Sequence, residues 1–517
     1  MKYLLTAAQA RRIDEHTIQE IGVPSLVLME RAALAVCDTI EKESGGDRSK
    51  KILLFSGSGN NGADACAVAR LLHLKGYGVS TIVLGDPERY TEELKIQIGI
   101  LEKLNLPVTS LGDLISSSEE PGADSIGIRT VKKIMEGYDV IVDGIFGIGL
   151  SRYVEGYAKY VIEAMNEAKK PIIAIDVPSG ISATTGAILG TAVNARVTVT
   201  FGKKKVGLTL FPGADYAGAV VEADCGFVEE GIEDLGSCSY TYELSDLSRI
   251  PLRSQSSNKG TYGRVLVIAG SDTMSGAAFL AAKAALRCGV GLVRLLTTRS
   301  NREAIQKLLP EAVLGFYDEM TNFELEKAMD EATAVVIGPG LGKAPRAKEV
   351  VELVLSHDIK RLLLDADALN LVAELHWQEK LAGHTITPHM GEMARLNAME
   401  IGDIKMNVVD VAKAFAQKYQ CNVVLKDART VVAVPEEEAV FINTSGNSGM
   451  STAGAGDVLT GVIAGMWAAG LNNAEGARMG VYLHGLAGDE AAATLGERFM
   501  TASDIIEHWK DTLKSIE

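Results

Sequence analysis

The chain has 517 residues, which is more than one ordinary hydrophobic core accommodates, so its length predicts two or more domains. Hydrophobic residues make up 47% and charged residues 23% of the chain, a composition that indicates a globular protein and excludes a disordered one. The formal net charge is −16 and no basic run is longer than residues 203–205, which disfavours nucleic-acid binding.

The same features bear on compartment and membrane association. The six cysteines show no CxxC spacing, so we expect reduced thiols and no zinc site. The apolar run at the start is too short for a signal peptide, and the longest later run, residues 458–471, falls short of the roughly 20 residues that a membrane span needs. We expect a cytoplasmic protein that binds neither membranes nor nucleic acid.

The first half begins with helical periodicity over residues 5–45, which Pro24 interrupts. Residues 51–56, KILLFS, are a continuous apolar run typical of a buried parallel strand, and GSGNNGAD then turns into a predicted helix. Gly57, Gly59 and Gly62 match the spacing of the dinucleotide-binding fingerprint, and Asp86 follows the next predicted strand where a ribose-binding acid would lie. This spacing by itself allows a nicotinamide dehydrogenase.

Other residues of this half favour a more specific site. Asn60 and Asn61 offer amide oxygens and N–H groups that suit a monovalent cation or a polar ring substituent, although asparagine also simply tolerates turns. Residues 140–152, VIVDGIFGIGLSR, and 171–180, PIIAIDVPSG, predict strands that end at Asp143 and at Asp176, with Ser179 just beyond. One such Asp is commonly a turn former, but three polar strand ends together predict a ligand site at the carboxyl edge of a parallel sheet.

GNNGAD, DGIFGIG and DVPSG, in this order, resemble the NAD(P)H-hydrate epimerases over roughly residues 1–225. The resemblance implies a Rossmann-like three-layer αβα domain that interconverts the R and S hydrates of NADH and NADPH. It implies that K⁺ is bound by Asn61, Asp143 and Ser179, and that Asp143 transfers the proton when C6 is epimerised. The implied substrate-binding residues are Asn60, Asn61, Gly62, Ala63, Asp64, Gly147, Ile148, Gly149, Leu150, Ser151, Arg152, Tyr153 and Asp176.

Position 63 departs from this family, which usually has glycine there. If the position requires a positive φ, Ala63 is strained and the epimerase is weakened; the rival hypothesis is a metabolite-binding scaffold that has lost catalysis because of Ala63. After this domain the chain becomes glycine-rich, irregular and mixed in charge, which predicts a linker over residues 226–244 and a second domain over residues 245–517.

The second half again alternates predicted strands with glycine-rich turns. Residues 264–271, 334–342 and 361–372 read as strands, the last of which ends at Asp365 and Asp367, and residues 423–434 read as a hairpin that bends at residues 426–430. His389 directly precedes a predicted helix. A single His or Asp in such a place is more often structural than catalytic, but together these turns predict a cleft at the sheet edge.

Residues 443–461, NTSGNSGMSTAGAGDVLTG, are the strongest signal in this half. Apolar residues recur at helical spacing after Asp457, so a helix is predicted to begin near Gly454. The backbone amides of Gly454, Ala455 and Gly456 would then form an anion hole, because the first amides of a helix have no helical acceptor. Asp457 would be either a helix-start residue or a proton acceptor beside a phosphate.

SGAA, GPGLG, LDADALNL, TPHMGE, the KDART bend and GAGD resemble the NAD(P)H-hydrate dehydratase branch of the ribokinase-like superfamily over roughly residues 245–510. The resemblance implies a ribokinase-like αβα domain that dehydrates the S hydrate with ADP and Mg²⁺, Asp457 accepting the proton of the substrate hydroxyl. The hydrate would be bound by Ala277, Gly340, Gly342, His389 and Asp457, and ADP by Lys426, Asp427, Ala428, Arg429, Thr430 and Gly456. Members of this family form higher oligomers, so a homo-oligomer is expected.

Two alternatives remain at this point. One is a ribokinase-like kinase for a small molecule, such as a sugar or vitamin, fused to a dinucleotide-binding domain. The other is a nucleotide-sensing protein without catalysis. A kinase would accumulate a phosphorylated product, and a sensor would be indifferent to the loss of Asp457.

Overall fold

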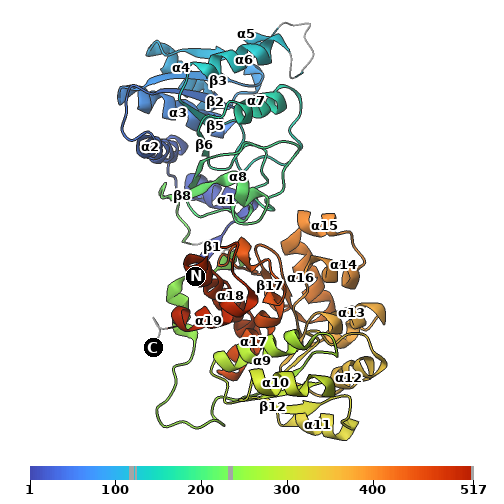
Figure 1. The fold of residues 1–517 in the computed structure, drawn as a ribbon. Coiled ribbons are helices and arrows are strands. Elements are labelled where there is room, and N and C mark those ends of the chain that lie inside the picture. The colour runs from blue at the N-terminus through green and yellow to red at the C-terminus, as the bar shows by residue number, and fades with distance from the viewer. Residues whose placement is uncertain (116–121, 123–124, 231–236, 514–517) are drawn as a thin grey trace. The chain divides into compact units, whose positions relative to one another are not determined.

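The structure is a computed structural model that describes residues 1–115, 122, 125–230 and 237–513. The chain divides into two compact units, one of them Tyr3–Cys238 and the other Met1–Lys2 with Ser239–Glu517. The division falls inside residues 226–244, of which residues 231–236 lie outside the described residues. Each unit is an α/β domain, as the sequence predicts, and each is described here by itself (Figure 1).

The N-terminal unit is built on a seven-stranded sheet in the order β4-β3-β2-β5-β6-β7-β8, in which all neighbouring strands are parallel. The strands after β1 (Lys2–Leu4) are β2 (Lys51–Ser56), β3 (Gly78–Val83), β4 (Val108–Ser110), β5 (Val140–Gly144), β6 (Ile172–Ile175), β7 (Val197–Phe201) and β8 (Ala219–Ala223). The helices are α1 (Ala7–Glu15), α2 (Ser25–Glu43), α3 (Asn60–Leu74), α4 (Glu92–Lys103), α5 (Leu111–Leu114), α6 (Ile126–Glu136), α7 (Gly156–Glu167) and α8 (Gly213–Ala217).

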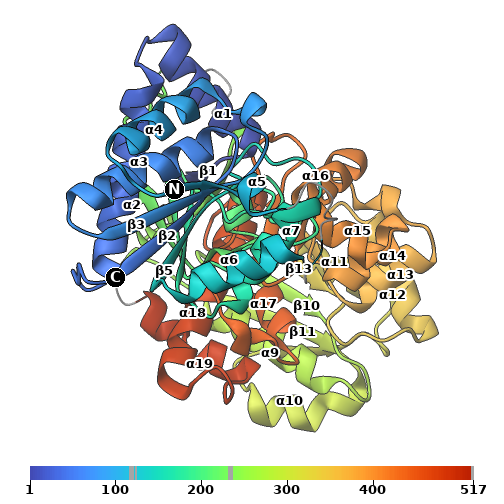
Figure 2. The ribbon, with the colours of Figure 1, turned by 90° about the horizontal axis from the view of Figure 1, so that it is seen from above.

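The apolar run of β2 explains why this sheet has helices on both faces. Successive side chains of a strand point to opposite faces. Ile52 and Leu54 pack in a core with α2, α3 and α4, whereas Leu53 and Phe55 pack in a core with α6 and α7. Figure 2 shows α3 and α4 on one side of β2 and α6 on the other. A strand with apolar side chains on both faces therefore lies inside a three-layer unit, with strands on either side of it.

The sheet of the C-terminal unit runs from β9 in the order β9-β18-β17-β16-β15-β14-β13-β10-β11-β12. All neighbouring strands among β10 to β16 are parallel, and β17 is antiparallel to both of its neighbours. The strands are β9 (Ser239–Thr241), β10 (Arg264–Ile268), β11 (Leu292–Thr297), β12 (Val313–Phe316), β13 (Ala334–Ile337), β14 (Leu362–Leu364), β15 (Thr385–Ile386), β16 (Asn422–Leu425), β17 (Val431–Ala433) and β18 (Phe441–Ile442).

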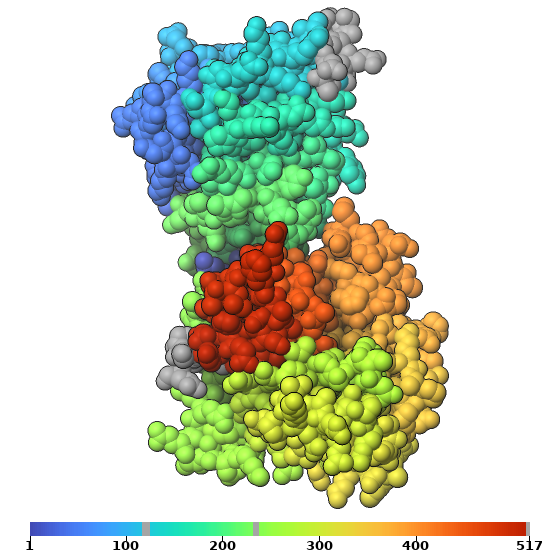
Figure 3. All heavy atoms as spheres, viewed as in Figure 1, coloured from blue at the N-terminus to red at the C-terminus, as the bar shows by residue number. Residues whose placement is uncertain are grey.

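The helices of this unit cover its sheet. They are α9 (Ser275–Arg287), α10 (Arg302–Leu308), α11 (Asn322–Asp330), α12 (Pro345–Ser356), α13 (Asp367–Glu374), α14 (Met390–Asn397), α15 (Ile401–Met406), α16 (Val408–Tyr419), α17 (Ala455–Ala468), α18 (Asn473–Leu495) and α19 (Ala502–Leu513). In Figure 3 the red atoms of the C-terminal helices form one continuous area of the surface of this unit. Among the described helices, none is both long enough and apolar enough to cross a bilayer.

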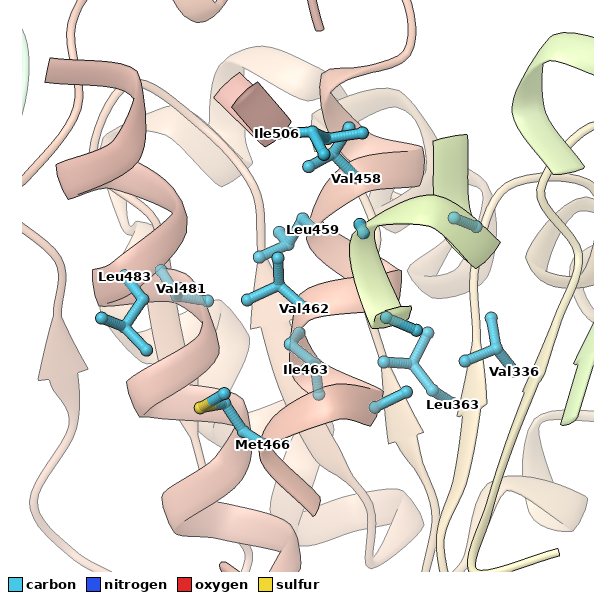
Figure 4. Packing of buried hydrophobic residues seen from close by; sticks show 14 of the residues in the cluster. Val336, Leu363, Val458, Leu459, Val462, Ile463, Met466, Val481, Leu483 and Ile506 are labelled. Atoms are coloured by element: carbon cyan, nitrogen blue, oxygen red, sulfur yellow. The ribbon is translucent and has the colours of Figure 1, made fainter. Parts of the chain in front are cut away.

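Helix α17 is the central helix of the C-terminal unit. All of its residues from Val458 to Ala468 are buried, and a helix that is apolar all round must be covered on every side. Figure 4 shows Val458, Leu459, Val462 and Ile463 between α18 and the strands, and burial of each such side chain stabilises the fold by about 1.5–3 kcal/mol. A Cβ on Gly461 would lie 2.1 Å from the carbonyl oxygen of Ala281. Glycine is therefore what allows α17 to approach α9 closely, and the start of α17 is rigidly placed.

Candidate active sites

A cavity of about 840 Å³ opens in the N-terminal unit at the carboxyl ends of its parallel strands. Its wall comes from the turn after β2 (residues 58–61), the loop after β5 (residues 145–152), Asp176 after β6, and residues 201–205 after β7. Residues of α1 and α2 complete it. This is the edge at which open parallel sheets bind ligands, and the volume suits a nucleotide-sized molecule.

Most of the substrate residues predicted for this unit line the cavity. They are Asn60, Asn61, Asp64, Gly147, Ile148, Gly149, Leu150, Ser151, Arg152 and Asp176. Gly62 and Ala63 are not on its wall, because the first turn of α3 directs them into the protein, where both are buried. Tyr153 is not on the wall either, and is 62% exposed.

Ala63 lies within α3 and is not among the described residues with a positive φ. The strain that a glycine-specific conformation would impose on alanine is therefore absent at this position. Glycine is needed elsewhere in this turn: a Cβ on Gly57 would lie 1.9 Å from the carbonyl oxygen of Ile145, and one on Gly62 would lie 2.0 Å from that of Gly57. Close packing of the turn thus accounts for these two glycines of the fingerprint. Asp86, the candidate ribose ligand, instead accepts a hydrogen bond from the amide of Glu88 at the start of a short 3₁₀ turn.

Asp143 and Ser179 form a fully buried pair behind the cavity. The Ser179 hydroxyl donates to Asp143 Oδ1 at 2.6 Å, and the Ser179 amide donates to Asp143 Oδ2 at 2.8 Å. The amide of Ile145 also donates to Oδ1. Burial raises the pKa of Asp143 to about 6, against the lowering effect of the hydrogen bonds from Ser179 and Ile145. Neither Asp143 nor Ser179 lines the cavity, so the structure places Asp143 in the second layer of the site.

Asp176 sits on the cavity wall in a conformation that is rare for a residue other than glycine, with φ +63°. Its Oδ1 accepts hydrogen bonds from Lys205 Nζ at 2.6 Å and from Thr200 Oγ1 at 3.2 Å. Lys205 also donates to Thr200 Oγ1 and to the carbonyl oxygen of Phe201, so this nearly fully buried ammonium group is satisfied. Sequence reasoning missed Lys205, which carries no local signal beyond membership of a short basic run.

The candidate site of the C-terminal unit is formed where α17 begins. Gly454 precedes the helix with φ +91°, a conformation that favours glycine, and Asp457 lies in its first turn. The amide of Ala455 donates to the carbonyl oxygen of Thr452 at 3.3 Å, which leaves Gly456 as the best placed of the predicted anion-hole amides. Burial raises the pKa of Asp457 to about 7, and the negative charge of Asp365 contributes to the rise.

Lys426 supplies the positive charge of this site. Its Nζ lies 2.7 Å from Asp365 Oδ1, and a Cβ on Gly456 would lie 3.3 Å from the same nitrogen. The ends of β14 and β16 and the start of α17 therefore meet at one point. The sequence predicts Lys426 at the hairpin bend, but only the sheet order shows that its partner is Asp365.

The other residues predicted to bind the hydrate each contact another residue at a neighbouring strand end. Gly340 lies against Ala277, because a Cβ on Gly340 would be 2.8 Å from the Cβ of Ala277. The amide of Gly342 donates to Asp367 Oδ2 at 2.8 Å. His389 is the N-cap of α14, with Nδ1 accepting from the amide of Gly391, and its Nε2 lies 3.4 Å from Glu392 Oε1. The structure thus gathers these groups at the ends of β10, β13, β14 and β15.

The hairpin bend at residues 426–430 is tied to the glycine-rich segment. Lys426 forms a parallel backbone bridge with His389, and the Lys426 amide donates to the carbonyl oxygen of Pro388 at 2.8 Å. Arg429 Nη1 donates to the carbonyl oxygen of Thr444 at 3.1 Å, and the Thr430 hydroxyl donates to the carbonyl oxygen of Asp427 at 3.4 Å. Asp427 and Ala428 are exposed at the tip of the bend.

Comparison with known proteins covers both units. The family model described as YjeF-related protein N-terminus matches residues 25–207, and the model described as NAD(P)H-hydrate dehydratase matches residues 265–510. A bifunctional NAD(P)H-hydrate repair enzyme of Moorella thermoacetica is 36% identical, with 100% of this chain and 97% of that protein covered. A bifunctional NAD(P)H-hydrate repair enzyme of Thermofilum pendens is 33% identical, with 98% of this chain and 96% of that protein covered. A solved ribokinase-like superfamily protein from Enterococcus faecalis is 29% identical over 54% of this chain and 96% of its own, with a TM-score of 0.50.

Proposed function

This chain belongs to the family of bifunctional NAD(P)H-hydrate repair enzymes, and on that premise we propose how its two units share the repair. Residues 1–225 form the epimerase domain, which interconverts the R and S hydrates of NADH and NADPH. Residues 226–244 are the linker, and residues 245–517 form the domain that dehydrates the S hydrate with ADP. The epimerase thereby makes both hydrates available to a dehydratase that accepts one of them.

The observation that carries the dehydratase assignment is the carboxylate of Asp457 at the start of α17, beside the Lys426–Asp365 ion pair. Hydroxide is a poor leaving group, so the C6 hydroxyl of the hydrate is first phosphorylated by ADP. Asp457 accepts the hydroxyl proton, while Lys426 and the amide of Gly456 stabilise charge on the phosphoryl group that moves. Loss of phosphate from C6 and of a proton from C5 then restores the dihydropyridine ring of NAD(P)H.

The other predicted residues are proposed to bind the two substrates. Ala277, Gly340, Gly342 and His389 would hold the hydrate, because they line the strand ends that face the start of α17. Burial and the positive charges of Lys426 and Arg395 lower the pKa of His389, which favours a neutral imidazole there. The bend from Lys426 through Asp427, Ala428 and Arg429 to Thr430, with Gly456, would hold ADP.

Mg²⁺ fits this site as a companion of ADP. Within the part of the chain that the structure describes, no three His, Cys, Asp or Glu side chains gather as a metal cage. Mg²⁺ commonly binds through one or two carboxylates together with substrate phosphates, and Asp365 and Asp367 lie beside the proposed phosphate position. Bound there, the ion would neutralise phosphate charge.

The residues proposed for K⁺ in the N-terminal unit also fit that ion. Asn61, Asp143 and Ser179 offer an amide oxygen, a carboxylate and a hydroxyl, the oxygen ligands that a hard cation requires. Asn61 lies against the loop that follows Asp143, since a Cβ on Gly147 would be 3.1 Å from Asn61 Oδ1. Asn61 Oδ1 is the atom that would bind the ion, whereas the buried Asn61 Nδ2, which has no hydrogen-bond partner among the described residues, would donate to an oxygen of the substrate.

We also propose that the protein is a cytoplasmic homo-oligomer. Leu26, Val27 and Leu34 are exposed on α2 and would suit a contact between copies of the chain. Light scattering of the purified protein, compared with a Val27→Glu variant, would show whether this surface joins subunits.

The function is tested by incubating the purified protein with mixed R and S hydrates, with and without ADP and K⁺. With both present, all of the hydrate should be converted to NADH, which is measured by its absorbance. With ADP alone, only the S hydrate should be consumed rapidly, and with K⁺ alone the two epimers should equilibrate without forming NADH. Accumulation of a stable phosphorylated product would instead identify a kinase and contradict the proposal.

A further inference from the structure

Two carboxylates of the N-terminal cavity have oxygens that accept no hydrogen bond from the residues that the structure describes. Asp64, in the first turn of α3, lines the cavity and accepts no hydrogen bond from the described residues. Asp176 receives the hydrogen bonds of Lys205, Thr200 and the amide of Phe201 on Oδ1 alone. Its Oδ2 accepts none from the described part of the chain. Both groups are therefore available to a ligand in the cavity.

Asp143 differs from them in each respect. Both of its oxygens accept hydrogen bonds, from the hydroxyl and amide of Ser179 and from the amide of Ile145. It is fully buried and does not line the cavity. A group that donates a proton to substrate must come within hydrogen-bond reach of it, and Asp143 is not on the cavity wall. This geometry suits a cation ligand better than a proton donor.

We propose that Asp64 is the catalytic acid of the epimerisation and that ionised Asp176 stabilises the cation formed on the substrate. The inference rests on the epimerase function proposed above. Asp64 gives its proton to the C6 hydroxyl, the C6–O bond breaks, and its electron pair leaves with water. The lone pair of N1 then forms a C6=N1 double bond, so the ring becomes an iminium cation. Water adds to the opposite face of C6 and returns a proton to Asp64, with no net oxidation or reduction.

The charges around the cavity support this division of roles. Burial, and then the negative charges of Asp176 and Asp14, hold the pKa of Asp64 well above its usual range, which favours the protonated form of this carboxyl group. Asp176 is paired with Lys205, whose Nζ lies 2.6 Å from its Oδ1, so a positive charge stands directly beside this carboxylate. The other charged side chains on the wall are Arg11 and Glu15 of α1, Arg152, Lys203 and Glu229. A carboxyl group with a raised pKa next to a second carboxylate that is paired with lysine suits acid catalysis through a cation.

The test compares full-length wild type with Asp64→Asn, Asp64→Glu and Glu15→Gln. Glu15→Gln is the matched control, because Glu15 lines the same cavity and the substitution likewise replaces a carboxyl group by an amide. Asp64→Asn should lower kcat of epimerisation by about 10²–10⁴-fold and leave KM within about threefold, while Asp64→Glu should recover at least part of that loss. The alkaline fall of the wild-type pH profile should disappear in Asp64→Asn. ADP-dependent dehydration of pure S hydrate should be unchanged in every variant, which shows that the C-terminal unit is folded, and the thermal unfolding of the N-terminal unit should match that of wild type.

An increase in KM with an unchanged kcat in Asp64→Asn would show that Asp64 only binds substrate and would overturn the inference. In water labelled with oxygen-18, each hydrate molecule that wild type has epimerised should carry a labelled oxygen at C6. Epimerisation with full retention of the original oxygen would exclude the cation and overturn the role of Asp176. Absence of any epimerisation by wild type would contradict the proposed function itself, a result distinct from either of these.

Discussion

Lys426 Nζ lies 2.7 Å from Asp365 Oδ1, and this ion pair joins the ends of β16 and β14 in front of α17. Asp365 is almost fully buried and Lys426 is only slightly exposed. Two charges removed from water cost free energy that their attraction offsets only while both are present. The pair therefore fixes a positive charge beside Gly456. Burial is the main cause of the raised pKa of Asp457, to which the charge of Asp365 adds, whereas the charge of Lys426 lowers that pKa.

Substituting Lys426→Met should lower the free energy of unfolding by about 2–3 kcal/mol, because Asp365 is left buried without its partner. Urea unfolding at pH 7 measures the change. The double variant Lys426→Met with Asp365→Asn should recover more than half of the lost stability. Equal losses in the single and double variants would show that the ion pair contributes little.

The rate of dehydration should rise with pH through about 7, since Asp457 accepts a proton only when ionised and its pKa is raised to about 7. The profile of kcat/KM on pure S hydrate with saturating ADP measures this. An ordinary carboxylate would give a flat profile above pH 5, and that result would contradict the raised pKa of Asp457.

Asp457→Asn should make the protein more stable at pH 8. The folded state raises the pKa of Asp457 from 3.8 to about 7, so burying the ionised carboxylate lowers the free energy of unfolding. This loss of stability is complete above pH 7 and absent below pH 3.8. Removing the charge should therefore increase the free energy of unfolding at pH 8 by on the order of 2 kcal/mol, after allowance for partial exposure to water. The difference from wild type should shrink steadily as the pH falls from 7 to 4, and a constant difference would point to another cause.

Ala63→Gly should cost about 1 kcal/mol of stability and give no gain in epimerisation. Ala63 lies inside α3, where glycine is the less favourable residue. Thermal unfolding of the N-terminal unit and the rate of epimerisation measure the two effects. Faster epimerisation in Ala63→Gly would show that alanine does restrict the site.

The sequence predicts those parts of the fold that depend on neighbouring residues. The continuous apolar run KILLFS corresponds to β2, and the change to helical spacing after Asp457 corresponds to α17. Pro24 separates α1 from α2, as its fixed φ and missing N–H require. In each case the signal lies within a dozen residues of the element that it specifies.

Contacts between distant strand ends are less accessible to sequence reasoning. Lys205 pairs with Asp176 because β6 and β7 are neighbours in the sheet, and nothing next to Lys205 in the sequence indicates this. The glycines at 57 and 62 fit a dinucleotide fingerprint, yet their lack of a side chain is accounted for by backbone packing. Whether Asp143 faces the cavity or the protein interior depends on how the loop after β5 closes over Ser179, which local patterns do not encode.

The most direct measurement is the yield of NADH from pure S hydrate and ADP with wild type and with Asp457→Asn, alongside epimerisation of the R hydrate by the same two proteins. Dehydration should fall by about 10²–10⁴-fold in Asp457→Asn, because the hydroxyl proton then has no acceptor, while epimerisation continues at the wild-type rate. Dehydration by Asp457→Asn within about threefold of wild type would contradict the role of the carboxylate at the start of α17.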